Sequence, residues 1–168
     1  LLVWGIPSFR DMLRNQQRDA ALFDLVSDLN LARSEALKRG TSVTLCKSGS
    51  GTSCGTGSTG YETGWIVFTD PSSSGTQGAV DSGETLLRAH PAPDGTLTIR
   101  TTASTMQNRV TFNPNLRVNT LGTLVVCDAR GASYARALVI DGVGRVRTAA
   151  DSNGDGTVDV GGSNVTCP

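Results

Sequence analysis

The first forty residues constrain the fold most, because they join an uncharged apolar segment to a long helical pattern. Residues 1–7, LLVWGIP, carry no charge. After them, apolar residues recur at spacings of three and four and so fall on one helical face: Leu22, Leu25, Val26, Leu29, Ala32 and Ala36. We predict one helix from Pro7 to about Lys38, ended by Gly40. We interpret its apolar start as the last turns of a membrane-spanning segment.

The rest of the chain has the composition of a β-rich head. Most of the 20 glycines lie after Lys38, and loops of Gly, Ser, Thr, Pro and Asn separate short apolar or alternating runs. We expect strands at residues 42–47, 64–69, 85–88, 96–101, 109–112, 122–127, 136–141 and 145–148. The expected fold is therefore α+β, with an N-terminal helix (residues 1–40) packed on antiparallel sheet in a globular head (residues 41–168).

The chain has four cysteines, Cys46, Cys54, Cys127 and Cys167. Their spacing does not match a zinc site, and only one histidine is present. Three disulfide pairings are open. We favour Cys46–Cys54, which flank a Gly/Ser/Thr loop, with Cys127–Cys167, which would tie the carboxyl end to an apolar strand. The alternative is four reduced thiols in a cytosolic protein, but the apolar start favours an oxidising compartment such as the periplasm.

Several local sequences occur in the same order as in a known family. They are ARSEALKRG at 32–40, VTLC at 43–46, GWIVFTD at 64–70 and GRVR at 144–147. Together they resemble type IV pilins, and within these the FimT/FimU minor pilins and the H-type pseudopilin (GspH) of type II secretion. The resemblance covers the chain from Pro7 to about Thr148.

The resemblance implies a type IV pilin-like fold and a structural role without catalysis. Such a subunit is held in the inner membrane by one pass of its N-terminal helix, with its head in the periplasm. The family also has an amino-terminal cleavage and methylation site. The subunit is extracted into a pilus together with other pilin and minor pilin subunits, often in a tip or priming complex. Two alternatives remain open: a minor pseudopilin of type II secretion, and a soluble periplasmic binding module.

A basic stretch in the second half of the chain is a candidate site for an anionic partner. Residues 85–150 hold eight arginines against three acidic residues. If Arg145 and Arg147 alternate along a strand, their guanidinium groups share one face and could grip phosphates of double-stranded DNA without reading sequence. Arg130 and Arg136 belong to the same stretch. In FimT-like minor pilins, a Gly-Arg-x-Arg segment is associated with DNA capture in natural transformation, and this chain matches it from Gly144. The alternative is that these arginines are solvated or pair with nearby acids.

The segment after the basic stretch is a candidate calcium loop. Asp151, Asn153, Asp155 and Asp159 stand at positions 1, 3, 5 and 9, and Thr157 offers its carbonyl at position 7. Position 12, however, is a glycine instead of the bidentate glutamate of such loops, and no flanking helices are expected. The alternative is a turn stabilised by Asx side chains, which needs no ion.

No arrangement typical of an enzyme is visible. The single histidine, His90, lies in a Pro-rich segment with no acidic residue beside it. A general base of this kind needs a nucleophile and an orienting carboxylate. We therefore predict no catalytic residue and no certain cofactor, with calcium as the one candidate.

Overall fold

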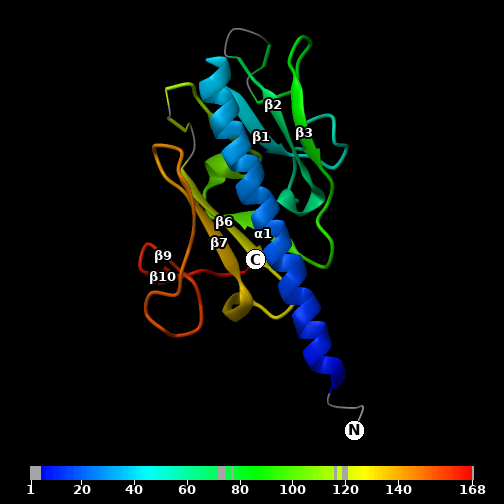
Figure 1. The fold of residues 1–168 in the computed structure, drawn as a ribbon, viewed down its shortest axis with the longest axis vertical. Helices are drawn as coiled ribbons and strands as arrows, with labels where there is room; N and C mark the ends of the chain where they lie inside the picture. The colour runs from blue at the N-terminus through cyan, green and yellow to red at the C-terminus, as the bar shows by residue number, and fades with distance from the viewer. Residues whose placement is uncertain (1–4, 72–74, 77, 116, 119–120, 168) are drawn as a thin grey trace.

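One long helix lies across two antiparallel sheets (Figure 1). The structure, a computed structural model, describes residues 5–71, 75–76, 78–115, 117–118 and 121–167. The α+β class predicted above, with one N-terminal helix on antiparallel sheet, is confirmed. A short hairpin and three single turns of 3-10 helix complete the described elements.

Helix α1 spans Gly5–Arg39, close to the predicted bounds. At 1.5 Å per residue, its 35 residues extend about 50 Å. It ends at Gly40, whose φ of 65° is accessible to glycine at little cost. Its buried apolar face holds Ala21, Leu25, Leu29, Ala32 and Ala36, with Leu22 and Val26 partly buried beside them.

The N-terminal part of α1 projects past the head (Figure 1). Phe9, Met12 and Leu13 are 59%, 52% and 40% exposed. Arg18 is the first buried residue among those whose side chains are described. Residues 1–4 of the predicted membrane segment lie outside the described residues. Within the described residues, no helix combines the length and the apolar character needed to cross a bilayer.

The first sheet has the strand order β3-β2-β1-β5. Its strands are β1 (Val43–Lys47), β2 (Trp65–Thr69), β3 (Leu86–His90) and β5 (Arg109–Phe112). Central strand β1 pairs Leu45 with Val67 of β2 and with Val110 of β5. Strands β1 and β2 are buried along their whole length, because the helix covers one face and loops cover the other.

The second sheet has the order β4-β6-β7-β8, so β8 is an edge strand. Its strands are β4 (Thr98–Thr101), β6 (Gly122–Cys127), β7 (Arg136–Ile140) and β8 (Val146–Thr148). A small hairpin of β9 (Asp159–Val160) and β10 (Ser163–Asn164), which the sequence analysis did not predict, follows it. The eight predicted strands all occur, with shifts of at most two residues at their ends.

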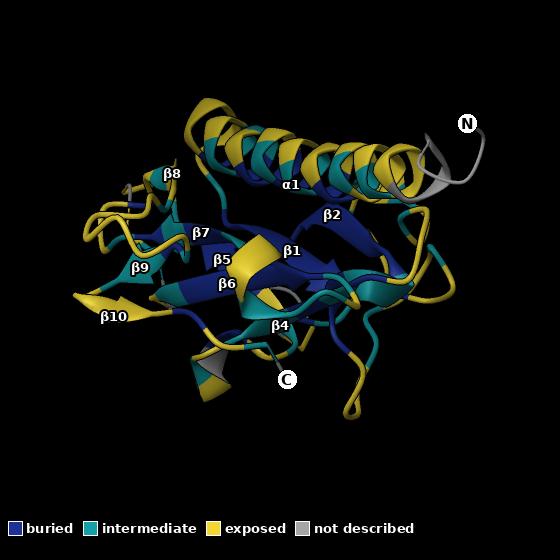
Figure 2. Cartoon of the chain, turned by 90° about the horizontal axis from the view of Figure 1, so that it is seen from below, coloured by how far each residue is buried: buried dark blue, intermediate teal, exposed yellow. Residues whose placement is uncertain are grey.

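The main core lies between α1 and the two sheets, and strands β1, β2, β6 and β7 below the helix are coloured as mostly buried (Figure 2). Trp65 and Tyr61 are its largest members and are fully buried. The structure contains the disulfides Cys46–Cys54 and Cys127–Cys167, which is the pairing favoured above. The first clips a loop to β1, and the second ties the carboxyl end to β6.

One buried carboxylate connects the helix to the first sheet. Asp28 of α1 is 1% exposed. One of its oxygens accepts a hydrogen bond from the Trp65 indole at 2.8 Å, and the other accepts one from Arg88 at 3.0 Å. Because β2 and β3 supply these two donors, Asp28 fixes the position of the helix on both strands.

Candidate nucleic-acid interface

The turn between β7 and β8 presents the Gly-Arg-x-Arg segment at the edge of the second sheet. Asp141 organises this turn: its carboxylate accepts hydrogen bonds from the backbone amides of Val143 (3.1 Å) and Arg145 (2.9 Å). Gly144 has φ 68°, and a Cβ atom there would lie 3.0 Å from Val118 and 3.3 Å from Phe112. The glycine therefore lets the turn close tightly over a neighbouring loop.

Arg145 and Arg147 both lie at the surface. Between them, Val146 pairs with Ile140 and packs against the main core, while Arg147 pairs with Val139. Residues opposite each other in antiparallel strands share a face, so Val146 and Arg147 alternate as expected from the sequence, while Arg145 lies in the turn, one residue before β8. The Arg145 side chain is 72% exposed, and its Nε lies 2.8 Å from Asp141 Oδ2.

The Arg145 backbone amide and side chain, together with the Val143 amide, lower the pKa of Asp141. Its carboxylate therefore stays ionised at neutral pH and offsets part of the Arg145 charge. No carboxylate lies within 4.0 Å of Arg147 in the part of the chain that the structure describes. Arg147 is thus the arginine of the segment with the freer charge.

Arg130 and Arg136 lie at the other end of β7, where acidic residues of α1 approach them. The Arg130 side chain is only 9% exposed and pairs with Asp128 at 2.7 Å. It also donates to Asn15 at 2.8 Å and lies over the Tyr134 ring. Arg130 is therefore occupied within the protein.

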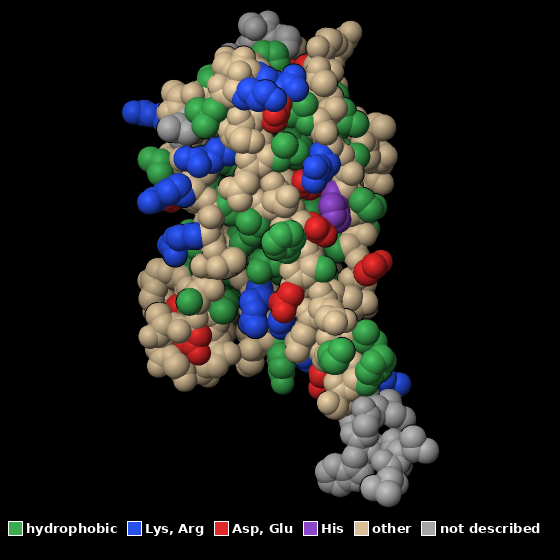
Figure 3. Space-filling view, viewed as in Figure 1, with side chains coloured by type: hydrophobic (Ala, Val, Ile, Leu, Met, Phe, Trp, Pro, Cys, Tyr) green, Lys and Arg blue, Asp and Glu red, His purple; other side chains and the backbone are tan. Residues whose placement is uncertain are grey.

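Arg136 is 41% exposed, and its Nε lies 3.9 Å from a carboxylate oxygen of Asp19 on α1. Figure 3 shows Lys and Arg side chains along the edge of the molecule beside α1 and the β7–β8 region. Of the four arginines of the predicted site, Arg130 is therefore largely buried and paired, Arg145 is exposed and Arg136 partly exposed with a carboxylate near each, and Arg147 is exposed with no carboxylate within 4.0 Å among the described residues.

Acid should destabilise the fold through the carboxylates whose pKa values are lowered. Hydrogen bonds and charge from Arg130 lower the pKa of Asp128 in the folded state. Because the folded pKa is below the unfolded value of about 3.9, this contribution is complete above that pH and is lost as pH falls further. We expect Arg130→Gln to move the acid-unfolding midpoint, followed by circular dichroism, to higher pH. Lys38→Gln, at an exposed ion pair, is the control and should leave the midpoint nearly unchanged.

The predicted calcium loop is a turn in which carboxylates accept hydrogen bonds from nearby groups. Asp151 accepts from the amides of Gly154 and Gly156, and Asp155 accepts from the Thr157 amide. Asp155 also accepts from the Asn164 side chain, which lowers its pKa.

Asp159 accepts from the amide and hydroxyl of Ser152 and from the Asn153 amide, so its pKa is lowered as well. Among the described residues, no group of three or more His, Cys, Asp or Glu side chains is placed to hold a metal ion. The calcium site stays a prediction.

The structure brings one acidic residue and one aromatic residue, both distant in sequence, to His90. Its ring stacks on Trp65, with centroids 4.1 Å apart, and Nε2 lies 3.2 Å from Asp24 of α1. Sequence reasoning missed these contacts, since β3 and the helix meet only in the fold. Both partners of His90 belong to the packing between helix and sheet.

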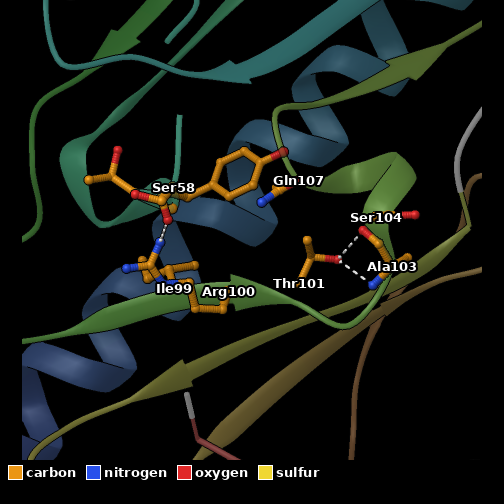
Figure 4. A pocket seen from close by; sticks show the side chains of 10 residues that line it. Ser58, Ile99, Arg100, Thr101, Ala103, Ser104 and Gln107 are labelled. Carbon is orange, nitrogen blue, oxygen red and sulfur yellow. Dashed lines mark hydrogen bonds between the residues drawn. The ribbon is translucent and has the colours of Figure 1, made fainter. Parts of the chain in front are cut away.

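A half-open pocket of about 220 Å³ lies between the loop before η1 (Tyr61–Thr63) and η2 (Ser104–Met106) (Figure 4). Arg100 on its wall donates to Ser58 O at 2.6 Å and pairs with Glu62 at 2.6 Å. Burial strongly raises the pKa of Tyr61, so its hydroxyl stays protonated. The polar groups of this pocket therefore bond to one another.

Comparison with known proteins identifies relatives of the whole arrangement. Residues 21–144 match the family model described as type II transport protein GspH. Two crystal structures of the type IV minor pilin FimU of Pseudomonas aeruginosa (strain PAO1), in two space groups, have similar folds. One is 23% identical with TM-score 0.57 and covers 80% of this chain and 89% of its own. The other is 22% identical with TM-score 0.56 and covers 77% and 90%. No curated protein sequence matches the chain.

Proposed function

Because the chain belongs to the GspH family, whose members are pilins and pseudopilins, we propose that it is a minor pilin of a type IV pilus. In this role it is a structural subunit that primes or caps assembly together with other pilin subunits. Its helix anchors it in the inner membrane, with the head in the periplasm, before it enters the fibre. The minor pseudopilin of a type II secretion system is the alternative within the family.

The observation that carries this proposal is the part of α1 that projects past the head. Phe9, Met12 and Leu13 expose apolar surface there, outside the core shared by helix and sheets. When a neighbouring subunit covers apolar side chains on a projecting helix, association is stabilised by about 25 cal/mol per Å² of apolar surface buried. A pilus subunit would bury this part of the helix in the fibre.

We expect Phe9→Asn combined with Leu13→Asn to prevent incorporation into the fibre without unfolding the head. The measurement is the amount of protein recovered with sheared surface fibres from cells that express the variant in place of the natural protein. The matched control is Leu37→Asn, which changes a 45%-exposed leucine at the other end of the same helix. Equal recovery of the double variant and the control would contradict assembly through this segment and favour a soluble periplasmic binding module.

Deletion of the gene separates the two branches of the family. Loss of surface fibres and of natural transformation, with protein secretion intact, supports the pilus. Loss of secretion with fibres intact supports the type II secretion branch.

A second function, sequence-independent binding of double-stranded DNA, is favoured by the exposed Arg145 and Arg147. Arg147 lies on edge strand β8 and Arg145 in the turn before it, so each guanidinium group can contact a phosphate, and this contact releases counterions. We expect Arg145→Ala combined with Arg147→Ala to weaken binding of a 30-base-pair duplex at least tenfold at low salt, measured by fluorescence titration. The control is Arg14→Ala, which removes an exposed arginine from the N-terminal part of α1. A dissociation constant above about 100 μM for the natural protein would contradict DNA binding, and so would an unchanged dissociation constant in the double variant.

A further inference from the structure

We infer that Arg33 of α1 and Arg117 of the β5–β6 loop belong to the same DNA-binding surface as Arg145 and Arg147. We call these four residues the arginine track. This inference rests on the proposed DNA binding and extends it, because it names residues from two further segments. The track recognises the phosphate backbone of a duplex across the edge of the second sheet.

Arg33 reaches the β7–β8 turn from the helix. Its Nη2 lies 3.5 Å from the carbonyl oxygen of Val143, in the middle of that turn. The side chain is partly buried, and its Nε is buried with no hydrogen-bond partner. Packing therefore holds the guanidinium beside the turn, while its charge stays without a carboxylate partner among the described residues.

Arg117 lies in a segment of the β5–β6 loop that packs against the same turn. Its neighbour Val118 forms a bridge with Phe112 of β5 and is the residue that a Cβ at Gly144 would meet at 3.0 Å. The Arg117 backbone is held by hydrogen bonds with Asn113 and Asn115, and its side chain is exposed. The loop thus places this arginine within one residue of the contact with Gly144.

The charges around the turn are strongly unequal. Asp141 pairs with Arg145, and Glu35, two residues from Arg33, is bound by Lys38 and Arg39. Asp151, Asp155 and Asp159 follow β8, but their carboxylates accept hydrogen bonds within their own loop and from Asn164. Figure 3 shows Lys and Arg side chains spread along this edge. Four arginines from three segments therefore lie in or beside a turn whose own acidic side chain is Asp141.

The arginine track can contact phosphates, but none of its four residues is an aromatic side chain on which a base could stack. The exposed aromatic side chains of the described residues are Phe9, Phe23 and Tyr134. Phe23 precedes Arg33 by ten residues, which is about 15 Å along a helix. Tyr134 contacts Arg130, and Phe112, beneath Gly144, is 2% exposed. Since single-stranded nucleic acid is usually bound by stacking on aromatic side chains, the track fits a duplex backbone instead.

The salt dependence of the binding constant measures how many arginines of the track contact phosphates. Each phosphate neutralised contributes about −0.9 to the slope of log K against log salt, so four arginines predict a slope of about −3.6, and two predict about −1.8. We expect Arg33→Gln and Arg117→Gln each to weaken binding of the 30-base-pair duplex roughly fivefold and to reduce the slope by about 0.9. Arg33→Lys and Arg117→Lys keep the charge and should recover most of the affinity. The melting temperature of each variant reports whether it is folded.

The outcomes separate this inference from the proposed function. If Arg33→Gln and Arg117→Gln bind like the natural protein while the Arg145/Arg147 double variant does not, the track is overturned and DNA binding stands. If Arg14→Gln weakens binding as much as they do, the effect is one of total charge and the track is also overturned. If the natural protein does not bind the duplex, both fail.

Discussion

Replacing Cys127 and Cys167 together by alanine is expected to lower the free energy of unfolding by about 4 kcal/mol. The bond joins positions 40 residues apart, and it ties the carboxyl end to β6. In the chain-entropy account, a cross-link stabilises by restricting the unfolded chain, and the effect grows with the logarithm of the loop length. The double variant should therefore lose a large share of the 5–15 kcal/mol that is typical of a domain.

The other disulfide is the matched control for this prediction. Cys46–Cys54 closes only 8 residues, so its removal should cost about 2.5 kcal/mol by the same account. Cys46 and Cys127 are both buried, which makes the small cavities left by the two alanine pairs similar. Urea unfolding without reductant, followed by circular dichroism, gives the two free energies. A greater loss from the short loop than from the long one would contradict the loop-length argument.

Asp28→Ala is expected to cost about 3 kcal/mol of stability, because it leaves a buried indole without its hydrogen-bond acceptor. Trp65 is fully buried and donates to this carboxylate, while Arg88, half exposed, donates to the other oxygen. Water can replace the carboxylate at Arg88 but not at Trp65. Most of the loss therefore comes from the unpaired indole.

Two variants of the same helix test this explanation. Asp28→Asn keeps an oxygen that can accept from Trp65, and it should cost about 1 kcal/mol. Asp24→Ala removes a 45%-exposed carboxylate one turn earlier, where it faces His90, and should cost less than about 1 kcal/mol. Chemical denaturation of the three proteins gives the order. An Asp28→Asn variant as unstable as Asp28→Ala would point to the Arg88 ion pair as the main contribution.

The helix and the longer strands could be predicted from the sequence because each is long enough to show a repeating pattern of apolar side chains. The apolar spacing of α1 identified both its length and its buried face, and Gly40 marked its end. Strands of four or more residues with apolar runs were located to within two residues. Strands β9 and β10 have two residues each and carry no pattern, so they were missed. The division into two sheets depends on which strands pair, and alternation within a strand does not contain that information.

The site was predictable in part, for a different reason. The Gly-Arg-x-Arg segment is local, and local order was enough to predict that Arg145 and Arg147 lie at the surface. Pairing with distant acids is not local: Arg130 lies 3.7 Å from Asp11 and Arg136 lies 3.9 Å from Asp19, and these residues of α1 meet the arginines only in the fold. A count of arginines against acids could not separate the occupied residues from the free ones.

Asp28 did leave a signal that sequence analysis overlooked. It lies three residues after Leu25 and four before Ala32, on the apolar face of α1. A carboxylate on a buried helical face must have partners, because burying an unpaired charge is costly. The pattern therefore predicted a polar contact, although it could not identify Trp65 and Arg88 as the donors.

Both covalent cross-links lie off the helix, which has mechanical consequences for a fibre subunit. The cysteines belong to strands, loops and the carboxyl end, and α1 contains none. A pulling force that enters the protein along α1 is therefore passed to the sheets through the backbone that leads into β1, through side-chain packing and through polar contacts such as those of Asp28, with no disulfide between helix and head. The helix and the sheets can shear apart under tension while each cross-linked part of the head keeps its shape.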